Sequence, residues 1–161
     1  PRDNEPPMEL VARLASEKAQ AVKAYLEDQL AMTDDKVILA SDTLISFNGQ
    51  SVGKPEDKAD SKRILTMLSG KTHDVLTAIC LLDNAQQQTQ VITTSVTFAA
   101  LTDEQIDAYW ETGEPADKAG SYAIQGIGGE FVVSINGSAS AVIGLPLYET
   151  RQLLNAFGVV S

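Results

Sequence analysis

The segment KVILASDTLISF, residues 36–47, decides how this chain folds. It is rich in Ile, Leu, Val and Phe, and a short apolar run bounded by turn signals is typical of a buried β-strand. Asn48-Gly49 follows, a dipeptide that suits tight two-residue hairpins, so we expect QSVG to return as a second strand. The sheet is therefore built outward from residues 36–47.

The flanking segments alternate between helical and strand patterns. Residues 8–29 predict a helix whose apolar stripe would be Val11, Leu14, Ala15, Val22 and Tyr25. Further helices are expected at 60–70, 103–112 and 147–157, with a capping box formed by Thr102 and Gln105. Strands are expected at 72–83 and 91–101, and the glycine-rich segment 120–144 also reads as strand-like, with a hairpin turn at Asn136-Gly137. This order predicts the α/β class, with a mixed β-sheet flanked by helices.

Composition limits the class of function. With 161 residues, 43% hydrophobic and 21% charged, we expect one domain over residues 1–161. The net charge of −10 argues against binding of nucleic acid or anionic membranes, which requires basic surfaces. Because the chain has a single cysteine, Cys80, and no apolar stretch of about 20 residues, we expect a cytoplasmic protein.

Asp42 is the least expected residue in the apolar segment VILASDTLI. A buried carboxylate is costly unless a metal, a cation or hydrogen-bond donors compensate it. If residues 37–40 are the strand proper, Asp42 lies at its carboxyl end, where ligands of open α/β sheets gather. The alternative is an aspartate that bonds only to backbone N–H groups of a turn.

Two lysines could supply compensating charge. Lys18 falls on the apolar stripe of the first helix, where its ammonium either reaches the surface or points into a cleft. Lys54 precedes a proline in the loop VGKPED. One aspartate with two lysines would suit a metal-bound phosphate chain.

Other motifs carry no function. Gly70-Lys71-Thr72 resembles the end of a phosphate-binding P-loop, but Leu65 stands where that motif needs glycine, and a helix ends there instead of beginning. GIGG after Gln125 lacks the spacing of a dinucleotide fingerprint, so it indicates a turn or a close backbone approach. His73 is the only histidine, which leaves no basis for a zinc site or a Ser-His-Asp triad.

Seven segments, in order, resemble the Maf proteins, a family of nucleoside triphosphate pyrophosphatases named for septum inhibition. The segments are RLASEKA (13–19), ASDTLI (40–45), GKPED (53–57), LSGKTHDVLTA (68–78), LTDEQIDAYW (101–110), DKAGSYAIQGIG (117–128) and INGSASAVIGLPL (135–147). The resemblance implies an inosine-triphosphatase-like fold with a deep cleft, a Mg²⁺ or Mn²⁺ cofactor and a homodimer. It also implies hydrolysis of a nucleoside triphosphate to the monophosphate and pyrophosphate.

The resemblance assigns roles to individual residues. Asp42 matches the family's proton acceptor and metal-binding residue, and Lys18 and Lys54 match its phosphate-contacting lysines. Arg13 falls among the substrate-binding positions, and Thr43 and Gln125 match positions linked to base selection. The THDV and IQG segments resemble the branch acting on dTTP, UTP and modified pyrimidines, whereas the sister branch, acting on methylated GTP, usually has glutamate in place of Gln125. An amide can both donate to and accept from a pyrimidine edge.

The chain departs from the family at its start. Family members open with a strand and a serine–arginine loop that cradles the triphosphate, and we expect that both are missing here, with Glu5 a loose match to a nearby acidic position. The alternative functions are a non-catalytic, nucleotide-binding regulator of cell division and an enzyme for a different triphosphate. The presence of Asp42 with both lysines favours the enzyme, because a sensor needs no general base.

Overall fold

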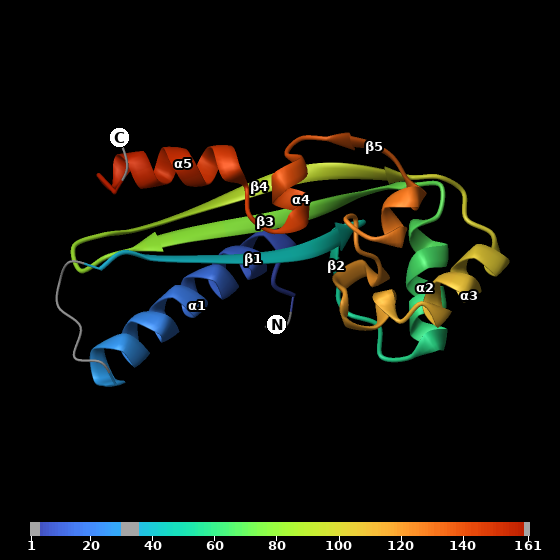
Figure 1. The fold of residues 1–161 in the computed structure, drawn as a ribbon, viewed down its shortest axis with the longest axis horizontal. Helices are drawn as coiled ribbons and strands as arrows, with labels where there is room; N and C mark the ends of the chain where they lie inside the picture. Colours follow the sequence, from blue (N-terminus) through green and yellow to red (C-terminus); the bar gives the residue numbers. More distant parts are fainter. Residues whose placement is uncertain (1–3, 30–35, 160–161) are drawn as a thin grey trace.

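The computed structural model describes residues 4–29 and 36–159. It has a layered arrangement, in which one long helix covers one face of a sheet and two C-terminal helices lie on the other (Figure 1). Two further helices pack together at one end of the sheet (Figure 1). Thr43, Lys54 and Gln125 lie at this end or on the adjoining sheet face, whereas Asp42, Lys18 and Arg13 lie on the side of the long helix.

The sheet has five strands in the order β2-β1-β3-β4-β5. The strands are β1 (Ile38–Phe47), β2 (Gln50–Val52), β3 (Thr72–Leu82), β4 (Gln87–Phe98) and β5 (Val132–Asn136). The helices are α1 (Pro7–Gln29), α2 (Lys58–Leu68), α3 (Asp103–Glu111), α4 (Ala139–Ile143) and α5 (Leu147–Ala156). Three 3₁₀ turns, η1 (Glu114–Asp117), η2 (Ala119–Ser121) and η3 (Ile127–Phe131), connect α3 to β5.

The predicted α/β class, with helices flanking a sheet, is confirmed. Among the described strands, however, all four pairings are antiparallel, so the mixed character expected from the sequence is not seen there. Short connections explain two of the four pairings, because β1 to β2 and β3 to β4 are hairpins, and hairpins join antiparallel strands.

Local turn and cap signals act as predicted. Asn48 and Gly49 have φ values of 51° and 77°, as the tight hairpin between β1 and β2 requires. Thr102 and Gln105 form the capping box at the start of α3. Gly70, with φ of 66°, follows the end of α2 and leads directly into β3, which agrees with the rejection of a P-loop.

Helix α1 packs on the sheet through its first half only. Val11, Ala15 and Ala19 are buried against β1 and β3, but Val22 and Tyr25 are 45% and 62% exposed. The prediction of one continuous core stripe is therefore wrong for these two residues. Figure 1 shows the reason, because the C-terminal half of α1 diverges from the sheet.

Residues 120–144 form much less strand than predicted. Only Val132–Asn136 pair with β4, while residues 119–131 fold into turns closed by local hydrogen bonds, such as Gly126 N to Ala123 O at 3.1 Å. The expected hairpin at Asn136-Gly137 is also wrong. Ser138 instead caps α4 by accepting a hydrogen bond from Ala141 N, because serine competes well for a helix start.

The core near α2 contains a buried aromatic cluster. His73, Phe98 and Tyr122 lie edge to face, with ring centroids 4.8–5.5 Å apart. His73 is only 2% exposed, and its Nε2 lies 2.7 Å from the Tyr122 hydroxyl. Burial lowers the pKa of His73 from 6.5 to about 4, so the ring is neutral at neutral pH.

We predict that His73 makes the stability of the fold depend on pH. Between pH 6.5 and about 4 the unfolded chain binds a proton at this residue and the folded chain does not. The free energy of unfolding therefore falls as the pH falls, by up to about 1.4 kcal/mol per pH unit. Chemical denaturation of wild type and His73→Gln at several pH values checks this: the variant should lose less stability across the window, and parallel profiles would refute it.

Candidate active site

Asp42 lies inside β1, and its nearest charged partner is Lys18 of α1. The Lys18 ammonium is 2.6 Å from Asp42 Oδ1 and 3.3 Å from the carbonyl oxygen of Ser41. The Asp42 side chain is 17% exposed and that of Lys18 is 56% exposed. The turn aspartate considered from the sequence is therefore wrong, and two candidate residues that are 24 positions apart meet at the sheet.

Successive residues of β1 face opposite sides of the sheet. Asp42 is opposite Ala78 of β3, on the face covered by α1, while Thr43 is opposite Thr77, on the face that carries α4. A strand alternates in this way with a period of two residues. Asp42 and Thr43 are thus neighbours in the chain on different faces.

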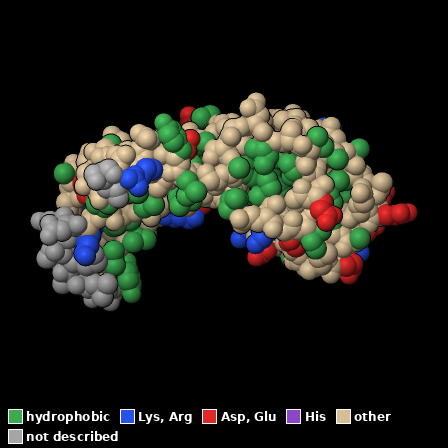
Figure 2. Space-filling view, turned by 45° about the horizontal axis from the view of Figure 1, so that its top comes forward, with side chains coloured by type: hydrophobic (Ala, Val, Ile, Leu, Met, Phe, Trp, Pro, Cys, Tyr) green, Lys and Arg blue, Asp and Glu red, His purple; other side chains and the backbone are tan. Residues whose placement is uncertain are grey.

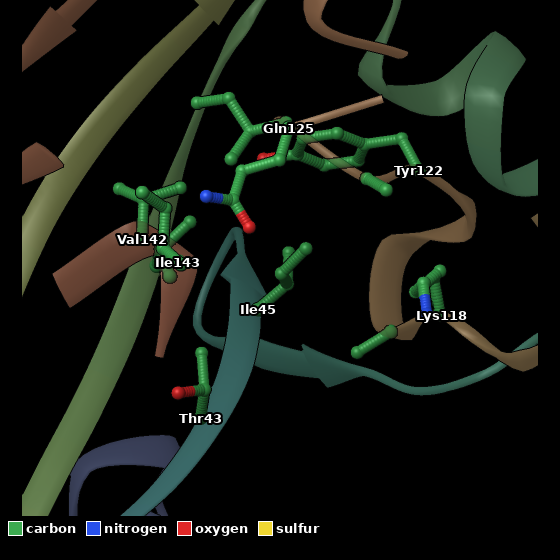
Figure 3. Close-up of a pocket in the computed structure, with 11 residues that line it drawn as sticks. Thr43, Ile45, Lys118, Tyr122, Gln125, Val142 and Ile143 are labelled. Carbon is green, nitrogen blue, oxygen red and sulfur yellow. The ribbon is translucent and has the colours of Figure 1, made fainter. Parts of the chain in front are cut away.

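A pocket of about 310 Å³ lies on the Thr43 side. Its wall comes from three parts of the chain: β1 with β3, the turns between α3 and β5, and α4. In Figure 3 the amide of Gln125 points into the space between Ile45, Val142 and Ile143. Figure 2 shows hydrophobic side chains gathered in a hollow of the lobe that carries α2 and α3, with charged side chains near it. The lining residues are Thr43, Ile45, Val75, Lys118, Ala119, Tyr122, Ala123, Ile124, Gln125, Val142 and Ile143.

A row of hydroxyl groups attaches α4 to the sheet. Thr77 donates to the carbonyl of Ala141 at 2.6 Å, and Ser41 donates to the carbonyl of Gly144 at 2.6 Å. Thr43 and Thr77 lie 3.2 Å apart and share one hydrogen bond. Because these bonds are made at a largely buried interface, they set the position of Val142 and Ile143 in the pocket wall.

One residue of the pocket lining, Tyr122, is a buried and uncharged tyrosine. Tyr122 is 6% exposed, and its hydroxyl is bonded to His73 behind it. Burial raises the pKa of Tyr122, so the phenol remains neutral.

The other two cations predicted from the sequence lie apart from Asp42. Lys54 is exposed and borders a separate hollow with Asp60 and Arg63. Arg13 donates to Glu5 at 2.8 Å and to Glu17 at 2.9 Å, and these bonds raise its pKa. In the part of the chain that the structure describes, no hydrogen bond or ion pair joins either cation to Asp42.

The sequence reasoning missed Lys118. Among the described residues that line the pocket it is the one charged side chain, 45% exposed and 3.4 Å from Asp117. In a protein with a net charge of −10, a cation in a pocket favours an anionic or carbonyl-bearing ligand. Lys118 stands in DKAGSYAIQG, directly before the turns that form the pocket. This position in the chain was the signal from which a pocket lysine could have been predicted.

The described carboxylates do not form an all-protein metal site. No group of three or more His, Cys, Asp or Glu side chains is found within residues 4–29 and 36–159. Mg²⁺ commonly binds one or two carboxylates and completes its shell with water and substrate phosphates. Asp42 fits that limited role. Within the same residues, none of the helices has the length and apolar character needed to cross a membrane.

Comparison with known proteins shows which family the chain belongs to. The profile of a family described as Maf-like protein matches residues 1–157. A dTTP/UTP pyrophosphatase of Colwellia psychrerythraea is 55% identical over 150 residues, covering 93% of this chain and 70% of that protein. Proteins of the same name from Vibrio vulnificus and Shewanella oneidensis are 47% and 48% identical, over 96% and 99% of this chain and 80% of each relative. With a family match over almost its whole length and relatives at this level of identity, the chain belongs to the Maf family.

Proposed function

We propose that this protein is a nucleoside triphosphate pyrophosphatase that hydrolyses the α–β phosphate bond of dTTP and UTP, including modified pyrimidine triphosphates. The observation that carries the proposal is the Asp42–Lys18 ion pair, one residue away from a pocket bordered by Thr43 and Gln125. The names of the Colwellia, Vibrio and Shewanella relatives support the same substrates.

Asp42 is the proton acceptor in this proposal. It takes one proton from a water molecule, whose oxygen forms a bond to the α phosphorus while the bond from that phosphorus to the bridging oxygen breaks. The products are a nucleoside monophosphate and pyrophosphate. A divalent cation, Mg²⁺ or Mn²⁺, would neutralise phosphate charge when bound, with Asp42 as a protein ligand.

In this proposal the phosphates of the substrate lie at Asp42 and Lys18, and its base lies in the pocket lined by Thr43 and Gln125.

The pocket chemistry suits a uracil or thymine base. These bases offer carbonyl acceptors and one N–H donor along a single edge, and the Gln125 amide can both donate and accept. Thr43 adds a hydroxyl, and the apolar side chains of Ile45 and Val142 contact the ring faces in this proposal.

The proposal also includes the other two cations that the family resemblance assigns. Lys54 and Arg13 contact substrate phosphates, and Arg13 then exchanges a carboxylate of Glu5 or Glu17 for a phosphate oxygen. We further propose a single domain over residues 1–161, a cytoplasmic location and a homodimer. Sedimentation of the full-length protein checks the dimer.

We predict that Asp42→Asn lowers kcat for pyrophosphate release from dTTP and UTP by about 10²–10⁴-fold, because an amide cannot accept the proton. Chelation of divalent metal should abolish wild-type turnover. The control is Asp74→Asn, which changes a carboxylate on the same sheet that bonds to Ser95, and which should stay within about twofold of wild type. A variant at Asp42 with more than a tenth of wild-type kcat, or nucleotide binding without any wild-type turnover, would favour the non-catalytic regulator instead.

We also predict that Lys18→Met and Lys54→Met each reduce kcat/KM for dTTP by about 10–100-fold, since each removes a charge-assisted bond to phosphate. Lys62→Met is the matched control, because Lys62 pairs with Asp107 on an exposed surface. Steady-state kinetics across pyrimidine and purine triphosphates measures these effects. Equal losses in all three variants would remove the special role of Lys18 and Lys54, and faster purine turnover would point to another substrate.

A further inference from the structure

The segment that carries Gln125 is held on both sides by one pair of residues. Ala123 N, two residues before Gln125, donates to the Tyr109 hydroxyl at 3.1 Å. Ile127 N and Gly128 N, just after it, donate to the two oxygens of Glu114 at 3.0 Å each. The Tyr109 hydroxyl in turn donates to Glu114.

The glycines of this segment make room for the same pair. A Cβ atom at Gly126 would lie 1.8 Å from Glu114 Oε1, and one at Gly128 would lie 2.5 Å from the Tyr109 hydroxyl. Neither position can carry a side chain while the contacts remain. Gly126 and Gly128 of the motif QGIGG are thus explained by close approach to Glu114 and Tyr109.

Tyr109 is held in place by packing, and Glu114 is held by hydrogen bonds to its carboxylate. Tyr109 is 2% exposed and meets the Phe131 ring edge to face at 5.0 Å. Burial alone would raise the pKa of Glu114, but the bonds from Tyr109, Gly128 and Ile127 together hold the pKa below its usual value. The carboxylate therefore stays charged, and hydrogen bonds to a charged acceptor are the stronger kind.

We infer that the Tyr109–Glu114 pair is a positioning device that aims the Gln125 amide at the nucleobase and thereby sets base selection. The inference rests on the proposed function, because it assigns the pocket to the base of that substrate. Neither residue touches the substrate. Both act through the backbone on the two sides of Gln125.

Glu114→Gln in the full-length protein tests this inference, because glutamine has nearly the same size and shape as glutamate. One amide oxygen cannot replace two charged acceptors, so the segment should shift. We expect KM for dTTP to rise about 10-fold with kcat within threefold. We expect the preference for dTTP over dCTP to fall about 10-fold, since donor and acceptor are exchanged between thymine and cytosine both at the exocyclic group of C4 and at N3. If Glu114→Gln folds poorly, Tyr109→Phe is the second test. It removes the contact with Ala123, and it should change KM and base preference in the same direction.

A double-mutant cycle separates positioning from general stability. If Glu114 acts through Gln125, adding Glu114→Gln to Gln125→Ala should change the dTTP/dCTP preference by less than twofold. Glu111→Gln is the control, because Glu111 lies on α3, the helix that carries Tyr109, but pairs with Lys58 on the exposed surface. Additive effects in the cycle, or an unchanged preference in both Glu114→Gln and Tyr109→Phe, overturn the inference.

The affinities of dTMP and dCMP, measured by calorimetry in the same variants, provide a readout that does not depend on turnover. If the wild type hydrolyses no triphosphate, but the variants show the same non-additive effects on the preference for dTMP over dCMP, the proposed function is overturned and the positioning role stands. A wild type that turns over dTTP but shows no coupling would overturn only the positioning role.

Discussion

The alternation of side chains along β1 is the constraint on which the rest of the structure depends. Asp42 and Thr43 are adjacent in the chain, yet a strand turns them to opposite faces of the sheet. One face is closed by α1, which brings Lys18 to Asp42, and the other is closed by α4 and the turns before β5, which surround Thr43 with the pocket. A one-residue slip in the pairing of β1 would exchange the two faces and dismantle both sites at once.

The walls of the pocket pack against the apolar core, and polar contacts fix their positions. Hydroxyls of Ser41 and Thr77 hold α4 against the sheet, and Tyr109 with Glu114 holds the segment around Gln125. A hydrogen bond at a partly buried interface is directional, so it specifies a position as well as stabilising it. A site that must distinguish one base from another benefits from walls with little freedom to shift.

Electrostatics explains how such an acidic protein could attract a polyanion. The net charge of −10 is spread over the whole chain, whereas Lys18 and Lys118 lie at the carboxylate and in the pocket. Local charge decides binding at contact distance, because salt screens the field of more distant groups within about 10 Å. The proposed metal would add positive charge at Asp42, which is the one carboxylate among the candidate residues.

Local sequence determined most of the secondary structure and the identity of Asp42 and Lys18 as unusual residues. The Asn48-Gly49 turn, the Thr102–Gln105 capping box and the first half of α1 all depend on patterns within a few residues, and a reader of the chain can recognise them. The resemblance to a family added Thr43 and Gln125 as residues of one site. Only the tertiary structure decided that Lys118 lines their pocket, that residues 119–131 fold as turns, and that Glu114 lies against Gly126. These features arise from contacts between segments far apart in the chain, and such contacts leave no periodic signal in the sequence of either segment.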